Sequence, residues 1–460
     1  MAKQPMGDVV VLLPGILGSV LERDGKDVWA MSKGAAFRAL MSLGGSIKGL
    51  QLDGDDPDAD DLGDGVVATR LLPDLHIVPG LWKIDGYSAI ANALHEEFEL
   101  IDGRNYFEFP YDWRRDNRAH GRRLARQAHD WLAEWRTSSG NTDAKLILLA
   151  HSMGGLVSRA FLELFDGWKD TRALITFGTP YRGSLNAVDF LAKGMKHGIG
   201  PVGLDLTDFL RSLTSVYQLL PIYPAIETEA GTTLRVAEAT IAGVDKIKAN
   251  DALGFHRQIE AAVAEHSSDA AYQDNGYRIH PVVGIGQPTM QGARLEGDQV
   301  TLLNNLGGRD LGGDGTVPRV SAMPIEMTDA AGGLFSPTRH SSMQNTDGVI
   351  SQVTGIITGA DIDLGGFRDR YAGLSLDLPD LVDAAAGIRI AARPTGGRDQ
   401  QLTATVTDAD TGVQVWSGQL AEDDWHIAQT APLVPGIYRV AVASAGAEMT
   451  DLVWAAGPEE

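Results

Sequence analysis

The chain has no cysteine among its 460 residues. Disulfide bonds, thiolate metal sites and a cysteine nucleophile are therefore excluded. A long apolar run near the start is also lacking, because Val9–Leu13 is too short to span a membrane and no signal-peptide cleavage pattern follows it. These absences predict a cytoplasmic protein.

Positive charge is scarce: Lys and Arg number 39 against 61 Asp and Glu, which gives a formal net charge of −22. A nucleic-acid ligand needs a basic footprint to neutralise its phosphates, so we expect no nucleic-acid partner. The same acidic excess disfavours electrostatic adhesion to anionic lipid head groups. Any transient membrane contact would have to be apolar or mediated by a partner.

Two segments of concentrated charge are predicted to be solvated surfaces. Residues 53–65, DGDDPDADDLGDG, lack the ligand register and terminal glutamate of an EF-hand loop, which favours a surface loop over a calcium site. The arginine cluster from Arg114 to Arg126 is explained by a solvated loop and helix face.

An alternation of strand and helix patterns covers the chain up to about residue 360. The expected strands are Val9–Leu13, Tyr106–Phe109, Leu146–Leu149, Ala173–Phe177 and Pro281–Ile285. The expected helical faces are formed by Tyr87, Ile90, Ala91, Leu94 and Phe98, and by Leu124, Trp131, Leu132 and Trp135. Most of these strands are apolar throughout, which is typical of a parallel sheet covered by helices on both faces.

The pattern changes near residue 375. From Gly387 onward, short β-type runs are separated by Gly, Asp and Pro turns, as in a small antiparallel sandwich of immunoglobulin-like size. We therefore predict an α/β catalytic domain over residues 1–372 and an all-β sandwich over residues 373–460. The sandwich carries no clustered His, Asp or Glu, and we expect it to dock, recognise or pack.

The stretch KLILLAHSMGGLVSRAFLELF predicts a buried strand, a tight turn and a helix. Ser152 lies on the turn among small residues, where its hydroxyl would be pushed out at the top of the sheet. His151 is expected to support this turn rather than to act as a base.

Two further residues complete a catalytic constellation. Asp314 lies in LGGDGTVPRV and His340 in FSPTRHSS, and the chain order Ser…Asp…His is the one that the α/β-hydrolase topology produces. Ser152 needs a base, the role predicted for His340, and Asp314 would orient and stabilise the imidazolium. A tetrahedral intermediate also needs backbone donors, for which we predict the N–H groups of Met153 and Ile16.

These segments together resemble the lecithin:cholesterol acyltransferase family, which includes phospholipid:diacylglycerol acyltransferases and lysosomal-type phospholipases A. The resemblance covers about residues 8–350 and rests on VVLLPGILGSVLE, FPYDWRRD, LLAHSMGGLVSRAFL, FGTPYRGS and GGDGTVP, followed by the His340 loop. It implies an α/β-hydrolase fold with Ser152, Asp314 and His340 as the triad, and it places Ile16 and Met153 at the oxyanion donors.

The chain departs from this family at several points. Ala150 replaces the usual glycine before the serine motif, and Ile16 replaces a more polar residue. The cysteine pair that staples the lid in secreted members is missing, and the C-terminal sandwich is not part of the family's usual pattern.

A lid or cap insertion is expected over about residues 181–280. Within it, apolar residues from Leu206 to Leu220 keep helical spacing over four turns, which predicts one amphipathic helix. Phe209, Leu213, Tyr217 and, from an earlier apolar segment, Trp82 are candidates for acyl-chain or membrane contact. The alternative is that this face simply packs on the hydrolase core.

The sequence thus predicts a serine-dependent lipid acyl hydrolase, a phospholipase A or lysophospholipase, that needs no metal or organic cofactor. One alternative is an acyltransferase that passes the acyl group to an alcohol or a sterol. Another is a regulated lipase effector whose β-sandwich binds a protein partner. A catalytically inactive binding protein is disfavoured because every triad position is filled.

Overall fold

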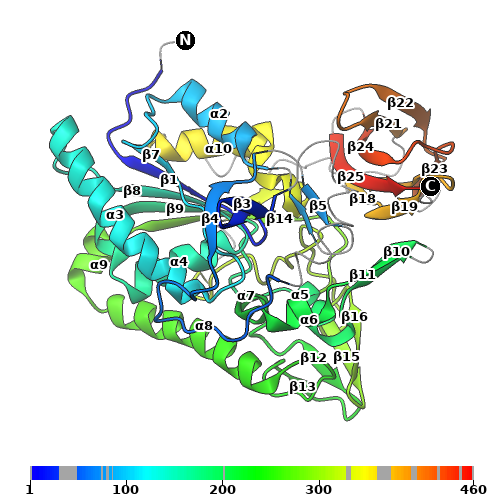
Figure 1. Ribbon diagram of the computed structural model, residues 1–460, viewed down its shortest axis with the longest axis horizontal. Helices are drawn as coiled ribbons and strands as arrows, with labels where there is room; N and C mark the ends of the chain where they lie inside the picture. Colours follow the sequence, from blue (N-terminus) through cyan, green and yellow to red (C-terminus); the bar gives the residue numbers. More distant parts are fainter. Residues whose placement is uncertain are drawn as a thin grey trace.

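The computed structural model describes residues 3–30, 49–73, 76–78, 82–84, 86–199, 202–327, 333–359, 374–394, 401–421, 425–444 and 448–457. A parallel β-sheet lies at the centre of the molecule (Figure 1). Its strands are β1 (Val9–Leu13), β7 (Tyr106–Glu108), β8 (Leu146–His151), β9 (Thr171–Phe177), β14 (Arg278–Gly284) and β17 (Leu334–Ser336). Both β1 and β8 are buried over their whole length, which explains their unbroken apolar sequences.

The order of the strands reverses at one point of the sheet. The order is β17-β14-β9-β8-β1-β7, so the chain runs from β1 outward to β7 and then crosses back to β8 on the other side of β1. Where connections leave neighbouring parallel strands in opposite directions, a crevice opens at their carboxyl ends. The loop after β1 carries Ile16 and the loop after β8 carries Ser152, so both lie at this point.

Helices cover both faces of the sheet (Figure 1). One layer contains α3 (Asn117–Ser139), α4 (Gly154–Leu164), α8 (Lys246–His266) and, at its edge, η1 (Gly167–Asp170) and α9 (Ala270–Asn275). The other contains α2 (Ser88–Glu97) and α10 (Asp347–Ile357). The predicted apolar faces are inside, with Ile90, Leu94, Leu124 and Leu132 all buried.

The part of the chain between β9 and α8 forms an additional subdomain. It contains α5 (Leu185–Lys193), β10 (Lys196–Ile199), β11 (Val202–Asp205), α6 (Thr207–Ser212) and α7 (Thr214–Gln218). It also supplies β12 (Ile226–Thr228) and β13 (Thr233–Leu234), which join β15 (Gly292–Glu296) and β16 (Gln299–Leu303) in a separate sheet. A cap insertion was expected here, and these elements occupy it.

The single amphipathic helix predicted between Leu206 and Leu220 is wrong in one respect. Leu213 adopts an extended conformation, with φ −75° and ψ 120°, and this residue separates α6 from α7. The apolar side chains on both helices are buried in the main core, which is the alternative that the sequence left open. Helical spacing alone could not distinguish a helix facing solvent from one packed inside.

Smaller β-structures flank the sheet. Strands β2 (Ser19–Arg23), β3 (Lys26–Trp29) and β4 (Val66–Leu71) form an antiparallel sheet directly after the β1 loop. A hairpin of β5 (His76–Val78) and β6 (Trp82–Ile84) follows. Among the described residues, no helix combines the length and apolar character that crossing a membrane requires.

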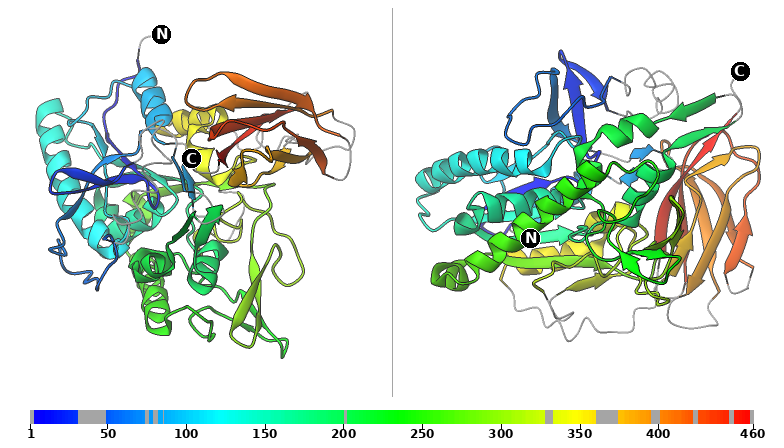
Figure 2. Two further views of the ribbon diagram at one scale, coloured as in Figure 1. Left: turned by 45° about the vertical axis from the view of Figure 1, so that its right-hand side comes forward. Right: turned by 90° about the horizontal axis from the view of Figure 1, so that it is seen from below.

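The C-terminal region is all-β, as predicted, and lies beside α10 in both views of Figure 2. Its strands are β18 (Leu374–Asp377), β19 (Leu381–Asp383), β20 (Arg389–Pro394), β21 (Thr403–Asp408), β22 (Gln414–Gln419), β23 (His426–Gln429), β24 (Gly436–Ala443) and β25 (Glu448–Ala456). They form sheets of order β18-β20-β23 and β19-β25-β24-β21-β22 around a hydrophobic core of their own. Their pairing is antiparallel except between β19 and β25.

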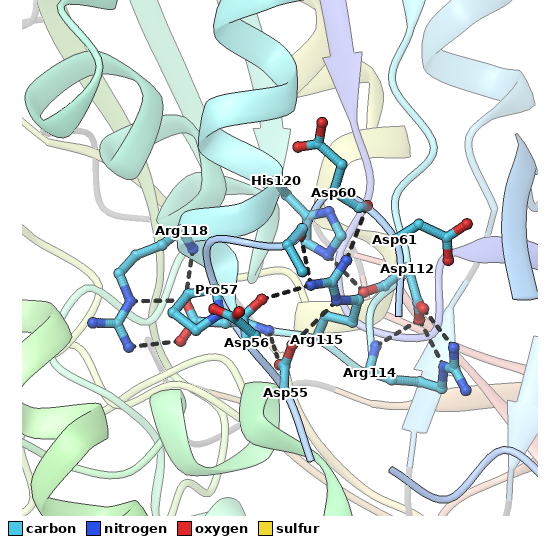
Figure 3. A network of polar contacts seen from close by, with 12 residues as sticks. Asp55, Asp56, Pro57, Asp60, Asp61, Asp112, Arg114, Arg115, Arg118 and His120 are labelled. Atoms are coloured by element: carbon cyan, nitrogen blue, oxygen red, sulfur yellow. Dashed lines mark hydrogen bonds and ion pairs between the residues drawn. The ribbon is translucent and has the colours of Figure 1, made fainter. Parts of the chain in front are cut away.

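The acidic run and the arginine cluster pair with each other, which corrects the prediction of separate solvated surfaces (Figure 3). Arg115 is only 4% exposed, and its guanidinium meets Asp55 Oδ1 at 3.1 Å. It also donates to the backbone carbonyls of Asp56, Ala59 and Asp60. Burial raises the pKa of the Asp55 carboxyl, and the adjacent Arg115 opposes that change.

Arg114 is the other buried cation of this region. Its side chain is inaccessible to solvent and forms ion pairs with Asp112 at 2.6 Å and with Asp64 at 2.9 Å. Arg122, in contrast, meets the exposed Asp58 at the surface. The acidic run is therefore fixed to the body of the protein by buried arginines, with further pairs at its rim.

We expect Arg115→Ala to lower the free energy of unfolding by about 3–5 kcal/mol, because it leaves the buried Asp55 without its counterion. Arg122→Ala is the matched control and should cost at most about 1 kcal/mol, since Asp58 is 88% exposed. Urea unfolding at pH 7 measures both changes. Equal effects of the two substitutions would contradict a structural role for the buried pair.

Candidate active site

The turn after β8 holds Ser152 in a conformation that non-glycine residues seldom adopt. Its φ is +50°, in the left-handed region, and the residue is buried. The small residues that follow are required by close contacts: a Cβ on Gly154 would lie 2.5 Å from the Pro14 carbonyl oxygen, and one on Gly155 would lie 2.1 Å from Thr179 Oγ1. The helix α4 can begin here only because these positions lack side chains.

The structure brings Ser152, His340 and Asp314 together in one hydrogen-bonded row. Ser152 Oγ lies 2.9 Å from His340 Nε2, and His340 Nδ1 lies 2.8 Å from Asp314 Oδ2. Because Nδ1 faces a carboxylate, we assign the proton to Nδ1, and this leaves Nε2 to accept from the serine hydroxyl. The arrangement can remove the proton of Ser152.

Asp314 is held in place from its other side. Its Oδ1 accepts hydrogen bonds from the N–H groups of Thr316 at 2.9 Å and Val317 at 2.6 Å. The backbone N–H of His340 donates to the Asp314 carbonyl at 2.9 Å, so the two loops are also joined through their main chains. Both side chains are almost completely buried, which shields their interaction from water.

Glycines let these loops approach one another. A Cβ on Gly284, at the end of β14, would lie 2.2 Å from the Asp314 Cβ. One on Gly178, after β9, would lie 2.8 Å from both Asp314 Oδ2 and His340 Nδ1. Gly178 also has a φ of +57°. Asp314 and His340 therefore lie next to the ends of β9 and β14, where the two glycines leave room for their side chains.

The loop after β1, for which the sequence predicts an oxyanion donor, runs beside the serine. A Cβ on Gly15 would lie 3.0 Å from Ser152 Cβ, so the backbone passes directly beside the nucleophile. Ile16 and Met153 are buried, and within the described part of the chain no protein acceptor takes a hydrogen bond from either backbone N–H. Both donors remain available for another acceptor.

Aromatic residues of the FPYDWRRD block hold this loop. Tyr111 Oη donates to the Pro14 carbonyl at 2.8 Å, and Trp113 Nε1 donates to the Ser19 carbonyl at 3.1 Å. Trp29 Nε1 donates to the Leu17 carbonyl at 3.1 Å. Motifs along the chain did not indicate these roles, because hydrogen bonds between separate segments follow no periodic pattern.

His151 and Tyr87 connect the oxyanion loop to the histidine loop. The Gly15 N–H donates to Tyr87 Oη at 2.7 Å, and Tyr87 Oη lies 3.0 Å from His151 Nδ1. His151 Nε2 lies 3.1 Å from the His340 carbonyl oxygen. Tyr87 thus donates to Nδ1, and His151 donates from Nε2, which agrees with the expected supporting role of His151.

His151 is neutral in this setting. Burial, together with the nearby His340, lowers the pKa of His151 to about 3. Burial also lowers the pKa of His120 and of His256 below the ordinary value. The ring of His151 therefore acts as a neutral hydrogen-bond bridge.

The predicted acyl-contact residues do not line an open surface in this structure. Phe209, Leu213 and Tyr217 are buried, and the Phe209 ring packs against Trp113 with centroids 6.3 Å apart. Tyr217 Oη accepts a hydrogen bond from the Asp245 N–H. The side chain of Trp82, which belongs to β6, lies outside the described residues.

No metal-binding arrangement is found within the described ranges, where no three His, Asp or Glu side chains come together as ligands.

Ser152 is buried on a strand–helix turn, has a left-handed backbone conformation, and is hydrogen-bonded to a His–Asp pair at the carboxyl end of a parallel sheet. This combination defines the α/β-hydrolase class. Residues 83–290 match the family model for lecithin:cholesterol acyltransferase, and the resemblance seen in the sequence is confirmed over that part of the chain. This match supports a lipid acyl hydrolase or acyltransferase.

Two solved structures are similar to the chain, and the first of them supports the fold. The structure of the Tle4-Tli4 complex is similar at 14% identity, covering 78% of this chain and 99% of that chain with a TM-score of 0.50. The Bacillus licheniformis lipase BlEst2 in its mature form aligns at 14% identity over 77% of this chain and 94% of that chain, with a TM-score of 0.36. No curated protein matches the chain.

We expect stability to fall as the pH decreases from about 6.5 toward 3, because the unfolded His151 takes up a proton that the folded one refuses. Each such histidine contributes up to about 1.4 kcal/mol per pH unit to the slope of the unfolding free energy against pH. In His151→Gln, which keeps an amide donor but does not titrate, the slope of unfolding free energy between pH 7 and 5 should be smaller by that amount.

Urea unfolding at several pH values tests this. His129→Gln is the control, because it makes the same exchange of residue types at an exposed position on α3. An unchanged slope in His151→Gln would show that His151 is protonated alike in both states.

Proposed function

We propose that the chain is a serine-dependent lipid acyl hydrolase, a phospholipase A or lysophospholipase, whose catalytic domain spans residues 1–372 and whose β-sandwich spans residues 373–460. The observation that carries the proposal is the row Ser152–His340–Asp314, with 2.9 Å and 2.8 Å between successive polar atoms. The lipid class is supported by the family match over residues 83–290.

The chemistry follows from these contacts. Ser152 Oγ attacks the ester carbonyl carbon while His340 Nε2 takes the hydroxyl proton, and Asp314 stabilises the imidazolium. The N–H groups of Ile16 and Met153 donate to the developing oxyanion. When the carbon–oxygen bond breaks, His340 returns the proton to the leaving alcohol. Water, deprotonated by the same histidine, then releases the fatty acid and restores the serine.

An acyltransferase would use the same residues. In that case a second alcohol replaces water in the deacylation step, and the acyl group becomes part of a new ester instead of a free acid.

A protein partner on the β-sandwich also stays a prediction. The fold neighbour Tle4 was solved as a complex with Tli4, and this supports the idea by analogy.

The first test compares wild type with Ser152→Ala on mixed phospholipid vesicles, with and without a long-chain alcohol. We expect fatty acid and lysolipid from wild type, detected by mass spectrometry, and a loss on the order of 10⁶-fold in Ser152→Ala. Ser158→Ala is the matched control, since this serine on α4 donates its hydroxyl proton to the Gly154 carbonyl of its own helix.

Each outcome has a distinct meaning. New esters formed with the alcohol would identify an acyltransferase. Products that do not depend on Ser152, or no product from any lipid, would contradict the proposal.

A second prediction concerns the oxyanion loop. Tyr87→Phe removes the acceptor of the buried Gly15 N–H and the donor to His151, so the loop that carries Ile16 loses its anchor. We expect kcat to fall by about 10–10³-fold, toward the cost of losing one oxyanion donor. Tyr106→Phe is the control, because the hydroxyl of this buried tyrosine has no partner among the described residues. Equal kcat values for the two variants would show that the Tyr87 anchor of this loop does not affect catalysis.

A further inference from the structure

The β-sandwich holds the loop that carries His340. Arg339, directly before this histidine, forms an ion pair with Asp451 on β25 and donates to the Leu376 carbonyl on β18. The Asp451 side chain is only 1% exposed and that of Arg339 is 18% exposed. The residue next to the proposed base is therefore fixed on two strands of the C-terminal region.

A buried glutamine makes a second connection between the sandwich and the site. Gln287 Nε2 donates to the Pro337 carbonyl at 2.7 Å and to the Leu374 carbonyl at 3.0 Å. Its Oε1 accepts from the Leu376 N–H at 3.3 Å. One side chain thus joins β18 to the segment that leads into the His340 loop.

The same connection reaches the loop of Asp314. The Gln287 N–H donates to the Gly313 carbonyl at 3.1 Å, and Gln287 and Asp314 form a short parallel bridge. Ser375 Oγ donates to the Gly286 carbonyl. Strand β18 is therefore bonded to the chain immediately beside both partners of the proposed acid–base pair.

A buried carboxylate such as Asp451 is costly without its cationic partner, so moving the sandwich away from Arg339 would expose or orphan a charge. Trp454, on the same strand β25, packs in the core of the α/β domain. The sandwich and the His340 loop are therefore joined by buried polar and apolar contacts.

We propose that the β-sandwich is a positioning element for the general base, and that Arg339 and Asp451 are positioning residues that hold His340 at hydrogen-bond distance from Ser152. The inference rests on the proposed function of that site. A displacement of about 1 Å in a catalytic group can cost about 10²-fold in rate, so a clamp beside His340 controls turnover without touching the substrate.

The test uses full-length variants and a short-chain p-nitrophenyl ester, with active sites counted by fluorophosphonate labelling. We expect Arg339→Met and Asp451→Asn each to lower kcat per active site by about 10–10²-fold with KM changed less than twofold. The double variant should lose no more than the worse single variant, because both remove one interaction. Arg339→Lys, which keeps the charge but reaches fewer partners, should recover part of kcat.

Arg389→Met is the matched control. This arginine is also on the sandwich, and its side chain is 53% exposed and 4.0 Å from Asp377. It should keep the wild-type kcat. If Arg339→Met and Asp451→Asn lower the melting temperature but leave kcat per labelled site unchanged, the pair is merely structural and the proposal is overturned.

A readout that needs no turnover separates this proposal from the proposed function. The Nδ1 proton that His340 shares with Asp314 should give a far-downfield proton NMR resonance, identified by its loss in Asp314→Asn. We expect this resonance to broaden or vanish in Arg339→Met and to persist in Arg389→Met. If wild type shows no Ser152-dependent hydrolysis, the proposed function is wrong, and this spectrum still tests whether Arg339 and Asp451 position His340. A resonance that survives in both Arg339→Met and Asp451→Asn would overturn it.

Discussion

The hydrogen bond between Ser152 Oγ and His340 Nε2 joins loops that lie 188 residues apart, and much of the molecule keeps their backbones close enough to form it. Three glycines, Gly15, Gly178 and Gly284, occupy positions where a Cβ would meet the serine, the histidine or the aspartate at 3.0 Å or less. Close approach of this kind is possible only where strands end side by side. The order of the parallel sheet, which places the β1 and β8 loops together, supplies that condition.

Several polar groups buried around the site are hydrogen-bonded to one another. Tyr87 and His151 connect the oxyanion loop to the histidine loop through a chain of hydrogen bonds. Because burial keeps His151 neutral, its ring can accept one of these bonds and donate the next. Tyr111 and Trp113 satisfy carbonyl groups of the same loop. An unpaired polar group in this environment would be costly, so each of these bonds restricts the position of the backbone that makes it.

The charge of the protein is distributed in a way that its composition hides. An acidic run that reads as free surface is fixed by Arg114 and Arg115, both of them buried. At the opposite end of the sequence, Arg339 and Asp451 join the histidine loop to the β-sandwich. Both cases place paired charges where the chain would otherwise be free to move, and the second makes the C-terminal region part of the site's support.

The sequence by itself determined the parallel strands, the helices that cover them, the all-β C-terminus and the set of Ser152, Asp314 and His340. Periodicity, small residues at turns and the order of the motifs can all be read from the chain without knowledge of the fold. Only the tertiary structure decided that the helix between Leu206 and Leu220 is broken and buried. The same holds for the partners of Arg115, His151 and Arg339, which lie 60, 189 and 112 residues away. Pairing over such distances leaves no periodic trace in the chain, because it depends on which loops the sheet brings together.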